Sequence, residues 1–566
     1  MKEAVVVLMM LVSVLSHAEY ELKTSWGLAM TAGKNTTQIS DMAVNDSVVF
    51  VVGTGLTKTE SDAIMIGDKE VAVGTASNAN NGNAVCVLAC IGREGDIRWS
   101  IYSKGGDVKP NDCFVSPTAD GGVVTVLSVR HPDYAPIGNI AIVDSKGRES
   151  NLGWKIQDKT QRYYRIVVMK ATAEGEIEWV RMAEVDHSPV AGTEKVVEEG
   201  FGLRSVLVAG AGDIYIAGRQ QKAIKMATSA TDSLEWQPVF VDGWDGVTSN
   251  QGGMFIAKLD KNGYLRRVVQ MEGEAKESNV LDLKASGGKI YALGTLTFEG
   301  ETEVRIGSKK MSYVGENSKN QAITIGKFTM DLDEEALWYY PSNLTGTVVN
   351  YTDMSIEGGD IYVVGKMKYG MAIEGAETIT TGELTRDGIA FRVSKEDGTV
   401  KDGRALGKIQ SGYAGMYKGR AGTYLFAQTS SGGEYIMEAY EGEDLTEPSR
   451  VETLIATASD IKGVVSLKTE EGARVIVAIR AGAKTNALYG GEVSIDLPSG
   501  RYSGEIAAYD IKEKGQDGTS VVELRSEEKE DNGVYDMTGR RVGWRSEIGT
   551  MRRGLYVAGG RLVRIR

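Results

Sequence analysis

The sequence predicts an all-β protein whose main part is a seven-bladed β-propeller, and three observations lead to this prediction. A strand motif that ends in Gly recurs at 213–218, 289–294 and 360–365, with its Gly residues 76 and 71 positions apart. Each copy lies in a unit that reads as four short strands joined by Gly turns, which is the make-up of one propeller blade. A Trp-bearing strand at 20–30 precedes the first unit and matches the strand that the last unit lacks.

Each unit is expected to begin with a hairpin of two strands, A and B. Strand A alternates polar and apolar residues, as at 281–285 and 352–356, and a tight Gly turn follows it. Strand B is the recurring motif, and looser copies of it lie at 48–53, 123–128, 423–428 and 474–479. Seven units fit between about residue 39 and residue 510, with six or eight blades as alternatives.

A second hairpin, of strands C and D, is expected to complete each unit. Residues 254–260, with the turn at 261–263, are an example of strand C, and strand D often carries a Trp, as at Trp99 and Trp179. The last unit has a strand C at 504–510 and no evident strand D. We therefore expect the N-terminal strand to complete blade seven, which closes the ring and removes an exposed strand edge.

The composition supports a globular chain and excludes several functions. The 70 Gly and 9 Pro among 566 residues indicate many tight turns between short strands. The net charge of −13 argues against a nucleic-acid-binding protein, which normally carries a basic stripe. Because only three His and three Cys are present, we expect neither a Cys/His metal site nor a cofactor.

The N-terminus reads as an export signal. Lys2 precedes an apolar run at 4–15, and small residues at positions 16 and 18 suit cleavage after Ala18. No other apolar stretch approaches the length of a membrane-spanning helix, so the mature chain is expected to lack a transmembrane segment. These features predict export across the inner membrane and a location outside the cell or on the outer-membrane surface.

The C-terminus is predicted to be a small basic β module at 531–566, which a charged linker at 511–530 separates from a propeller at 19–510. The module carries eight Arg and three acidic residues. Its stretches 534–542, 554–557 and 559–566 resemble the C-terminal sorting domain of the type IX (Por) secretion system of Bacteroidetes. The family's domain usually begins with a longer strand-forming stretch, which residues 511–530 lack.

The resemblance implies that the type IX secretion machinery recognises this tail. The residues that match the sorting motif are Tyr535, Asp536, Gly539, Arg540, Gly554, Leu555 and Tyr556. The repeats themselves resemble the SBBP family of bacterial β-propeller repeats, through 212–218, 359–365, 253–265 and 174–179. This second resemblance implies an extracellular propeller and no particular activity.

The lengths of the loops favour one face of the ring for binding. The segments between strands B and C are long in the first four units, at 55–82, 132–162, 221–252 and 298–319. Long loops on a rigid scaffold commonly carry function, so we expect ligand-binding aromatic residues on this face around the channel mouth. The candidates are Tyr134, Trp154, Tyr163, Trp236, Trp244 and Tyr313. Alternatively these residues pack the loops onto the blades, and the runs at 64–67 and 304–307 suggest that some loops form hairpins.

The search for catalytic and metal-binding residues gives few candidates. His131 and His187 have no Gly-x-Ser-x-Gly partner motif, and the Asp-containing turns at 260–263 and 395–398 read as ordinary type I turns. Cys86 and Cys90 lie about 13 Å apart on one strand, beyond disulfide reach. Cys113, at the start of the next strand A, could instead bridge to one of them.

Three carboxylates recur at matching points of strand A, namely Asp41, Asp282 and Asp353. Repetition in several blades suggests a structural role in bonding a neighbouring turn, and no catalytic residue is assigned. We therefore expect a scaffold that binds a glycan or protein ligand. The alternatives are a glycan-active hydrolase or lyase on the same fold, and a structural component of an envelope assembly.

Overall fold

The chain divides into two units, Glu19–Glu513 and a second that comprises Met1–Ala18 and Lys514–Arg566. The computed structural model describes residues 20–513 with gaps at 34, 60, 75–81, 131–138, 156–162, 189–199, 239–252, 274–276, 299–300, 315–319, 342–352, 369–385, 406–411, 421, 430–432, 443–444, 456–459, 483–485 and 497–501. Beyond residue 513 it describes 533–536, 541–544, 554–558 and 561–565.

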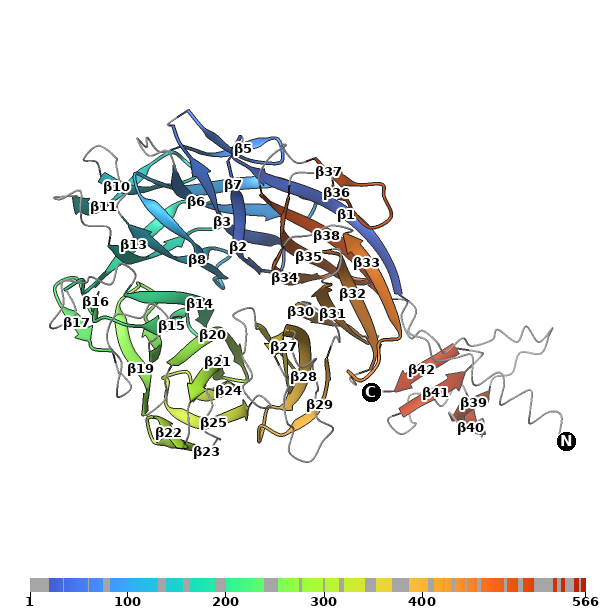
Figure 1. Cartoon of the computed structure of the whole chain (residues 1–566). Coiled ribbons are helices and arrows are strands. Elements are labelled where there is room, and N and C mark those ends of the chain that lie inside the picture. The colour runs from blue at the N-terminus through green and yellow to red at the C-terminus, as the bar shows by residue number, and fades with distance from the viewer. Residues whose placement is uncertain are drawn as a thin grey trace. The chain divides into compact units, whose positions relative to one another are not determined.

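The larger unit is a seven-bladed β-propeller in which each blade is an antiparallel sheet (Figure 1). Blade 1 consists of β2 (Thr37–Val44), β3 (Val48–Thr57), β6 (Asn83–Gly92) and β7 (Ile97–Lys104). Blade 2 consists of β8 (Asp107–Pro117), β9 (Val123–Arg130), β12 (Tyr164–Ala171) and β13 (Ile177–Val185). Blade 3 consists of β14 (Phe201–Ala209), β15 (Asp213–Gln220), β18 (Gly253–Leu259) and β19 (Leu265–Gly273).

The other four blades repeat the order A, B, C, D. Blade 4 consists of β20 (Glu277–Ser286), β21 (Lys289–Phe298), β24 (Asn320–Thr329) and β25 (Glu334–Pro341). Blade 5 consists of β26 (Asp353–Glu357), β27 (Asp360–Lys368), β28 (Arg386–Ser394) and β29 (Val400–Ala405). Blade 6 consists of β30 (Gly412–Lys418), β31 (Gly422–Gln428), β32 (Tyr435–Glu441) and β33 (Arg450–Ile455). Blade 7 consists of β34 (Asp460–Lys468), β35 (Gly472–Ala481), β38 (Ser503–Glu513) and β1 (Tyr20–Thr31).

The central strands of each blade are apolar on both faces because each sheet packs between two neighbours. In β6, for example, Val87 and Ala89 belong to one core cluster, whereas Leu88 and Cys90 belong to the next. Successive side chains of a strand point to opposite faces, so one strand contributes to two cores. This explains why the B and C strands read as continuous apolar runs in the sequence.

The N-terminal strand closes the ring, which confirms the predicted closure and the seven-blade count. β1 pairs antiparallel with β38 from Tyr20 opposite Glu513 to Met30 opposite Gly504. Strand C of this blade runs to Glu513, three residues beyond the predicted end at residue 510. It continues because Ile511 is fully buried in the core between blades 6 and 7.

Four blades carry two additional strands, supplied by a hairpin from the B–C segment of the following blade. We call these four elements the staple hairpins. They are β4–β5 (Ala63–Ile66, Lys69–Val73) on β1, β10–β11 (Asn139–Val143, Glu149–Lys155) on β7, β16–β17 (Ile224–Ala227, Ser233–Trp236) on β13 and β22–β23 (Glu301–Ile306, Lys309–Val314) on β19. The segment of blade 7 forms the short pair β36 (Asn486–Ala487) and β37 (Ser494–Ile495), and Leu488 beside it bridges to Ile455 at the end of β33.

A Trp on strand D also links neighbouring blades. The indole of Trp99 in blade 1 donates to the carbonyl of Ala173, in the C–D turn of blade 2, at 2.7 Å. A Cβ atom on Gly175 of that turn would lie 2.6 Å from the indole, so the close approach requires glycine. Trp26, Trp179 and Trp338 meet Gly95, Gly263 and Gly398 in the same way.

The second unit contains a four-stranded antiparallel sheet in the order β40-β39-β41-β42. Its strands are β39 (Gly533–Asp536), β40 (Arg541–Trp544), β41 (Gly554–Ala558) and β42 (Arg561–Ile565). In the described part of both units, no helix has the length and hydrophobicity needed to cross a membrane.

Candidate functional site

The central channel holds a cavity of about 500 Å³ lined by the innermost strands of six blades, namely β2, β8, β14, β20, β26 and β34. Its lining mixes apolar side chains with a small set of charged and hydroxyl groups. These groups are Ser40, Asp41, Ser116, Arg204, Ser205, Asp282, Lys284, Asp353 and Lys462. The cavity therefore has the usual form of a ligand site, a concave space with a few convergent polar groups.

Lys284 and two carboxyl groups from adjacent blades form the centre of this site. The Lys284 Nζ lies 3.1 Å from Asp282 Oδ2 on its own strand and 3.7 Å from Asp353 Oδ1 on β26. The Asp282 and Asp353 carboxyls therefore share one ammonium group. The Lys284 side chain remains 40% exposed, so its ammonium group is accessible from the channel. We call Asp41, Asp282, Lys284 and Asp353 the channel cluster.

Backbone irregularities in strand A place these side chains. In β2 and β20 one extra residue shifts the register just before Asp41 and just before Asp282. Such a bulge bends the strand and redirects the side chains beside it. Asp41 then accepts the N–H of Val115 in blade 2 at 2.9 Å, and Asp282 accepts the N–H of Met354 in blade 5 at 3.3 Å.

The surrounding protein perturbs the titration of the cluster. Burial raises the pKa of Asp41 to about 7, although the N–H groups of Val115 and Met42 act in the opposite direction. Burial raises the pKa of Asp282 to about 8, with Lys284 lowering it and Asp353 raising it. Burial alone would lower the pKa of Lys284, but the Asp282 and Asp353 carboxylates raise it above its usual range. At neutral pH the cluster thus offers a fixed ammonium donor beside carboxyls near their titration points.

Asp41 and Asp282 have the expected hydrogen-bonding role, but each bonds a strand of the next blade instead of a turn, whereas Asp353 accepts the N–H of Met354 in its own strand at 2.7 Å. Lys284 was missed from the sequence. It lies two residues after Asp282 and hence on the same face of β20. The equivalent positions of the other blades carry Ala43, Val115, Leu207, Ser355, Tyr417 and Val465. Lys284 is thus the one charged residue among these equivalent positions, and this difference from the other blades could have marked it as a functional candidate.

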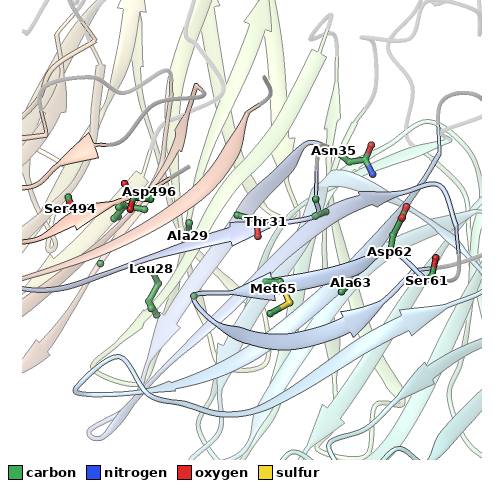
Figure 2. Close-up of a pocket in the computed structure, with 15 residues that line it drawn as sticks. Leu28, Ala29, Thr31, Asn35, Ser61, Asp62, Ala63, Met65, Ser494 and Asp496 are labelled. Carbon is green, nitrogen blue, oxygen red and sulfur yellow. The ribbon is translucent and has the colours of Figure 1, made fainter. Parts of the chain in front are cut away.

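A second cavity, of about 720 Å³, lies at the outer side of the closure between β1, the β4–β5 hairpin and the β36–β37 segment (Figure 2). Its polar groups include Asn35, Ser61, Asp62 and Asp496. The Asp62 carboxylate accepts the N–H groups of Lys58 and Thr59 at 2.6 and 3.1 Å. Because that carboxylate holds its own turn together, this cavity is the weaker candidate for binding.

The loop aromatics predicted to bind a ligand have several different surroundings. Trp236 is buried in β17 and packs against Phe255 with ring centroids 6.2 Å apart. Trp154 in β11 is half-buried beneath the Arg165 guanidinium, 4.5 Å from it. Tyr163 stacks on His187 at 4.1 Å. Tyr313 lies in β23, opposite Thr302. Tyr134 and Trp244 lie outside the described residues, as do His131, Gly539 and Arg540.

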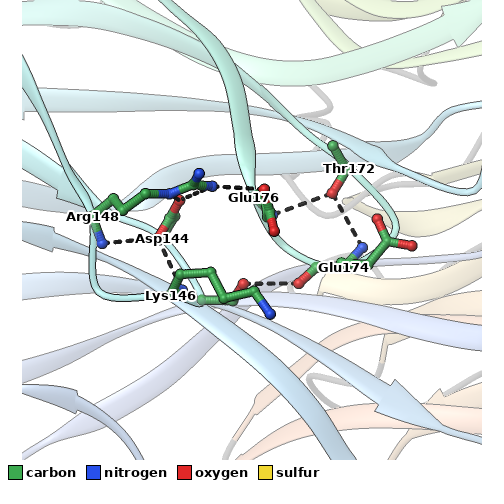
Figure 3. Close-up of polar contacts among 7 residues, drawn as sticks. Asp144, Lys146, Arg148, Thr172, Glu174 and Glu176 are labelled. Carbon is green, nitrogen blue, oxygen red and sulfur yellow. Dashed lines mark hydrogen bonds and ion pairs between the residues drawn. The ribbon is translucent and has the colours of Figure 1, made fainter.

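The staple hairpins explain why two of these aromatics pack instead of facing a ligand. The turn of β10–β11 contacts the C–D turn of blade 2 (Figure 3). There Arg148 bonds both Asp144 and Glu176, at 2.8 Å each, and the Ser145 hydroxyl donates to the Glu174 carbonyl. The long segments thus pair along the outermost strands of the blades, whereas the channel cluster lies on the innermost strands.

The structure also describes the surroundings of several other residues that the sequence analysis named. The Asp260 carboxylate accepts the N–H groups of Asn262 and Tyr264, which confirms a hydrogen-bonded turn. Across the described residues no group of three or more His, Cys, Asp or Glu side chains is arranged to hold a metal ion. Tyr535 and Asp536 lie in β39 opposite Val557 and Tyr556, and Gly554 and Leu555 lie in β41.

Comparisons with known proteins add no family. No family profile matches the chain, and no curated protein resembles it in sequence. Among solved structures, a levansucrase mutant from Bacillus subtilis aligns at 10% identity over 70% of this chain and 86% of its own, with a TM-score of 0.24. A structure described as NanB plus Optactamide aligns at 9% identity over 87% of this chain and 89% of its own, with a TM-score of 0.25.

Proposed function

We propose that this chain is an exported β-propeller that binds a neutral, hydroxyl-rich ligand, such as the end of a glycan, in its central channel. The observation that carries the proposal is the channel cluster, in which Lys284 contacts Asp282 and Asp353 at the wall of a cavity of about 500 Å³. A cavity of that volume is within the usual range for small-molecule sites.

The chemistry of the cluster suits sugar hydroxyl groups. An ammonium group donates hydrogen bonds, an ionised carboxylate accepts them, and a protonated carboxyl does both. Carboxyls that titrate near neutrality can therefore match a hydroxyl in either direction. Met42, Phe114 and Leu281 supply apolar lining for the less polar face of a sugar ring.

Binding is tested with a glycan array followed by calorimetric titration of the oligosaccharides that bind. Lys284→Met retains most of the side-chain length and removes the ammonium group, and we expect it to weaken binding by at least tenfold. The matched control is Lys310→Met, which removes an ammonium group on the β22–β23 hairpin that pairs with Glu303. Equal affinities for wild type and Lys284→Met would exclude the channel as the site.

The alternative of a glycan-cleaving enzyme makes a separate prediction. Glycosidases use two carboxyls about 5 to 9.5 Å apart that flank the scissile bond, whereas the Asp282 and Asp353 carboxyls both contact the Lys284 ammonium group, at 3.1 and 3.7 Å. This shared ion pair favours binding over cleavage. Release of reducing sugar that is abolished in Asp282→Asn but not in Lys310→Met would reverse the preference.

Export and surface display are the second part of the proposal, and they rest on the leader-like residues 1–18 and the tail at 531–566. The glycan or protein partner would then be extracellular, and the type IX secretion machinery would handle the tail. Cell fractionation of a chain truncated after residue 530 tests the tail. We expect the truncated protein to accumulate in the periplasm, and unchanged surface display would contradict the proposed sorting role.

A further inference from the structure

Two buried thiols meet at the junction between blades 1 and 2. Cys86 lies in β6, the C strand of blade 1, and Cys113 lies in β8, the A strand of blade 2. Their side chains are 3% and 0% exposed and belong to one core cluster. The Cys113 thiol donates to the carbonyl of Lys109 at 3.7 Å, and its interaction with the Cys86 thiol, together with burial, raises the pKa of Cys113.

The position of Cys113 depends on an irregularity in β8. The register of β8 against β9 shifts between Val108 and Cys113, so residues 109–112 protrude from the ladder. Cys113 then lies opposite Leu127 of β9. Its side chain belongs, with that of Cys86, to the core cluster between blades 1 and 2.

We propose that Cys86 and Cys113 are a disulfide-forming pair that covalently joins blades 1 and 2. Each thiol gives up one proton as the S–S bond forms, and the two electrons pass to an external disulfide oxidant, which leaves as two thiols. Exchange proceeds through a mixed disulfide, which requires access to one of the sulfurs. Because both side chains are buried in the folded ring, the reaction belongs to the folding step, before the two blades close.

Cys90 is the matched control within the same strand. It is 2% exposed, and it lies four residues from Cys86 on the same face of β6. That separation is about 13 Å along a strand, too far for a bond to Cys86. Its pair across the ladder is Trp99, so its surroundings are a packed apolar core. We therefore expect Cys90 to remain a thiol.

The experiment counts free thiols in the full-length chain refolded with glutathione disulfide. The protein is then unfolded in guanidinium with N-ethylmaleimide and analysed by intact mass and peptide mapping. The expected result is one maleimide, on Cys90, rising to three after reduction. Three maleimides without reduction, or a cross-linked peptide that joins Cys90 to Cys113, would overturn the proposal.

Cysteine variants identify which thiols account for the number of maleimide groups. Cys90→Ala should take no maleimide before reduction, and Cys86→Ala should take two. If Cys86→Ala does not refold, the wild-type count and the Cys90→Ala count still decide the matter. The oxidant is supplied in the test, so the result does not depend on the proposed export or on ligand binding. In the cell the oxidant would come from an oxidising compartment. The disulfide proposal therefore rests on the proposed export only for its occurrence in the cell.

Discussion

In the part of the chain that the structure describes, blades 7, 1, 2 and 3 are six-stranded, whereas blades 4, 5 and 6 are four-stranded. In the first group a staple hairpin from the next blade pairs with each outer strand, so every blade is hydrogen bonded to its successor. In the second group, among the described residues, β25 and β29 are paired along one edge only. The same repeat therefore gives a reinforced arc and a plain arc.

The charged groups are distributed in the opposite way. Asp282 and Lys284 belong to blade 4 and Asp353 to blade 5, so most of the channel cluster lies in the plain arc. Asp41 joins it from the reinforced arc. Most of the channel cluster thus lies at the junction of blades 4 and 5, where the described residues show no staple hairpin.

The largest expected effect comes from the Trp contacts between blades. Trp99→Ala, in the reinforced arc, should lower the free energy of unfolding by about 3–5 kcal/mol, because a buried indole and its hydrogen bond to Ala173 are lost. Trp338→Ala, in the plain arc, should cost less because Trp338 is only half-buried. Denaturant unfolding measures both. A larger loss for Trp338→Ala would mean that the plain arc depends more on this contact than the reinforced one.

The junction between blades 3 and 4 allows a sharper test, because it lacks the Trp–Gly pair. Arg267 takes the place of Trp and pairs with Asp333 at 2.6 Å, and the fully buried Leu332 takes the place of Gly with φ at +62°. Arg267→Trp should destabilise the protein by about 1–3 kcal/mol, since Leu332 fills the space that the indole needs.

Adding Leu332→Gly opens that space. The double variant should be less destabilised than the sum of the two single variants, with a coupling of about 0.5–3 kcal/mol. The four proteins of the cycle are compared by denaturant unfolding. Strict additivity would show that the indole and the turn residue do not share a site at this junction.

A pH effect of intermediate size is expected from the channel cluster. The folded protein holds protons on Asp41 and Asp282 that the unfolded chain releases at lower pH, since their pKa values are raised to about 7 and about 8. Stability should therefore fall as the pH rises from 5 to 8, and Tm should follow. Glu505, whose pKa burial raises to about 7, adds to the same trend from the closure.

Asp282→Asn removes one titrating group and should flatten this dependence. Melting curves at pH 5, 6, 7 and 8 for wild type and variant provide the comparison. An unchanged slope in Asp282→Asn would show that the Asp282 carboxyl does not exchange its proton in this range.

The smallest effect is expected at the exposed end of a staple hairpin. Glu176→Gln removes the ion pair with Arg148, but both side chains are well exposed and such pairs contribute little to stability. We expect a shift in the denaturation midpoint close to experimental error. A clear destabilisation would mean that the turn contact in Figure 3 carries more of the hairpin's attachment than the strand pairing does.

Much of the fold could be predicted from the sequence because a blade is a local unit. Several B strands are apolar runs with a terminal Gly. The strand at 20–30 matches strand D, and the last unit was the one that lacked a strand D. The hairpins at 64–67 and 304–307 were also visible, but their partners were not. Each pairs with the outer strand of the preceding blade, and alternation within a strand says nothing about which distant edge it meets.

The candidate site was harder to predict for the same physical reason. Asp41, Asp282 and Asp353 were recognised as recurring, and the hydrogen bonds of Asp41 and Asp282 to the next blade explain the recurrence of these two. What makes them a candidate site is the contact of Asp353 with Lys284 across two blades, which sequence spacing does not encode. The loop aromatics were misjudged at Trp236, because a large apolar side chain in a long loop reads alike whether it packs on a blade or faces a ligand.

The register of the closing strands has a mechanical consequence. Tyr20 lies opposite Glu513, so the chain enters and leaves the ring at neighbouring points of one strand pair. Tension between those two points would open the β1–β38 ladder one pair at a time, like a zipper, instead of shearing it along its whole length. A tether on the C-terminal side alone would place no such load on the seam. Holding the ring by one end thus spares the closing ladder, whereas pulling on both ends loads it directly.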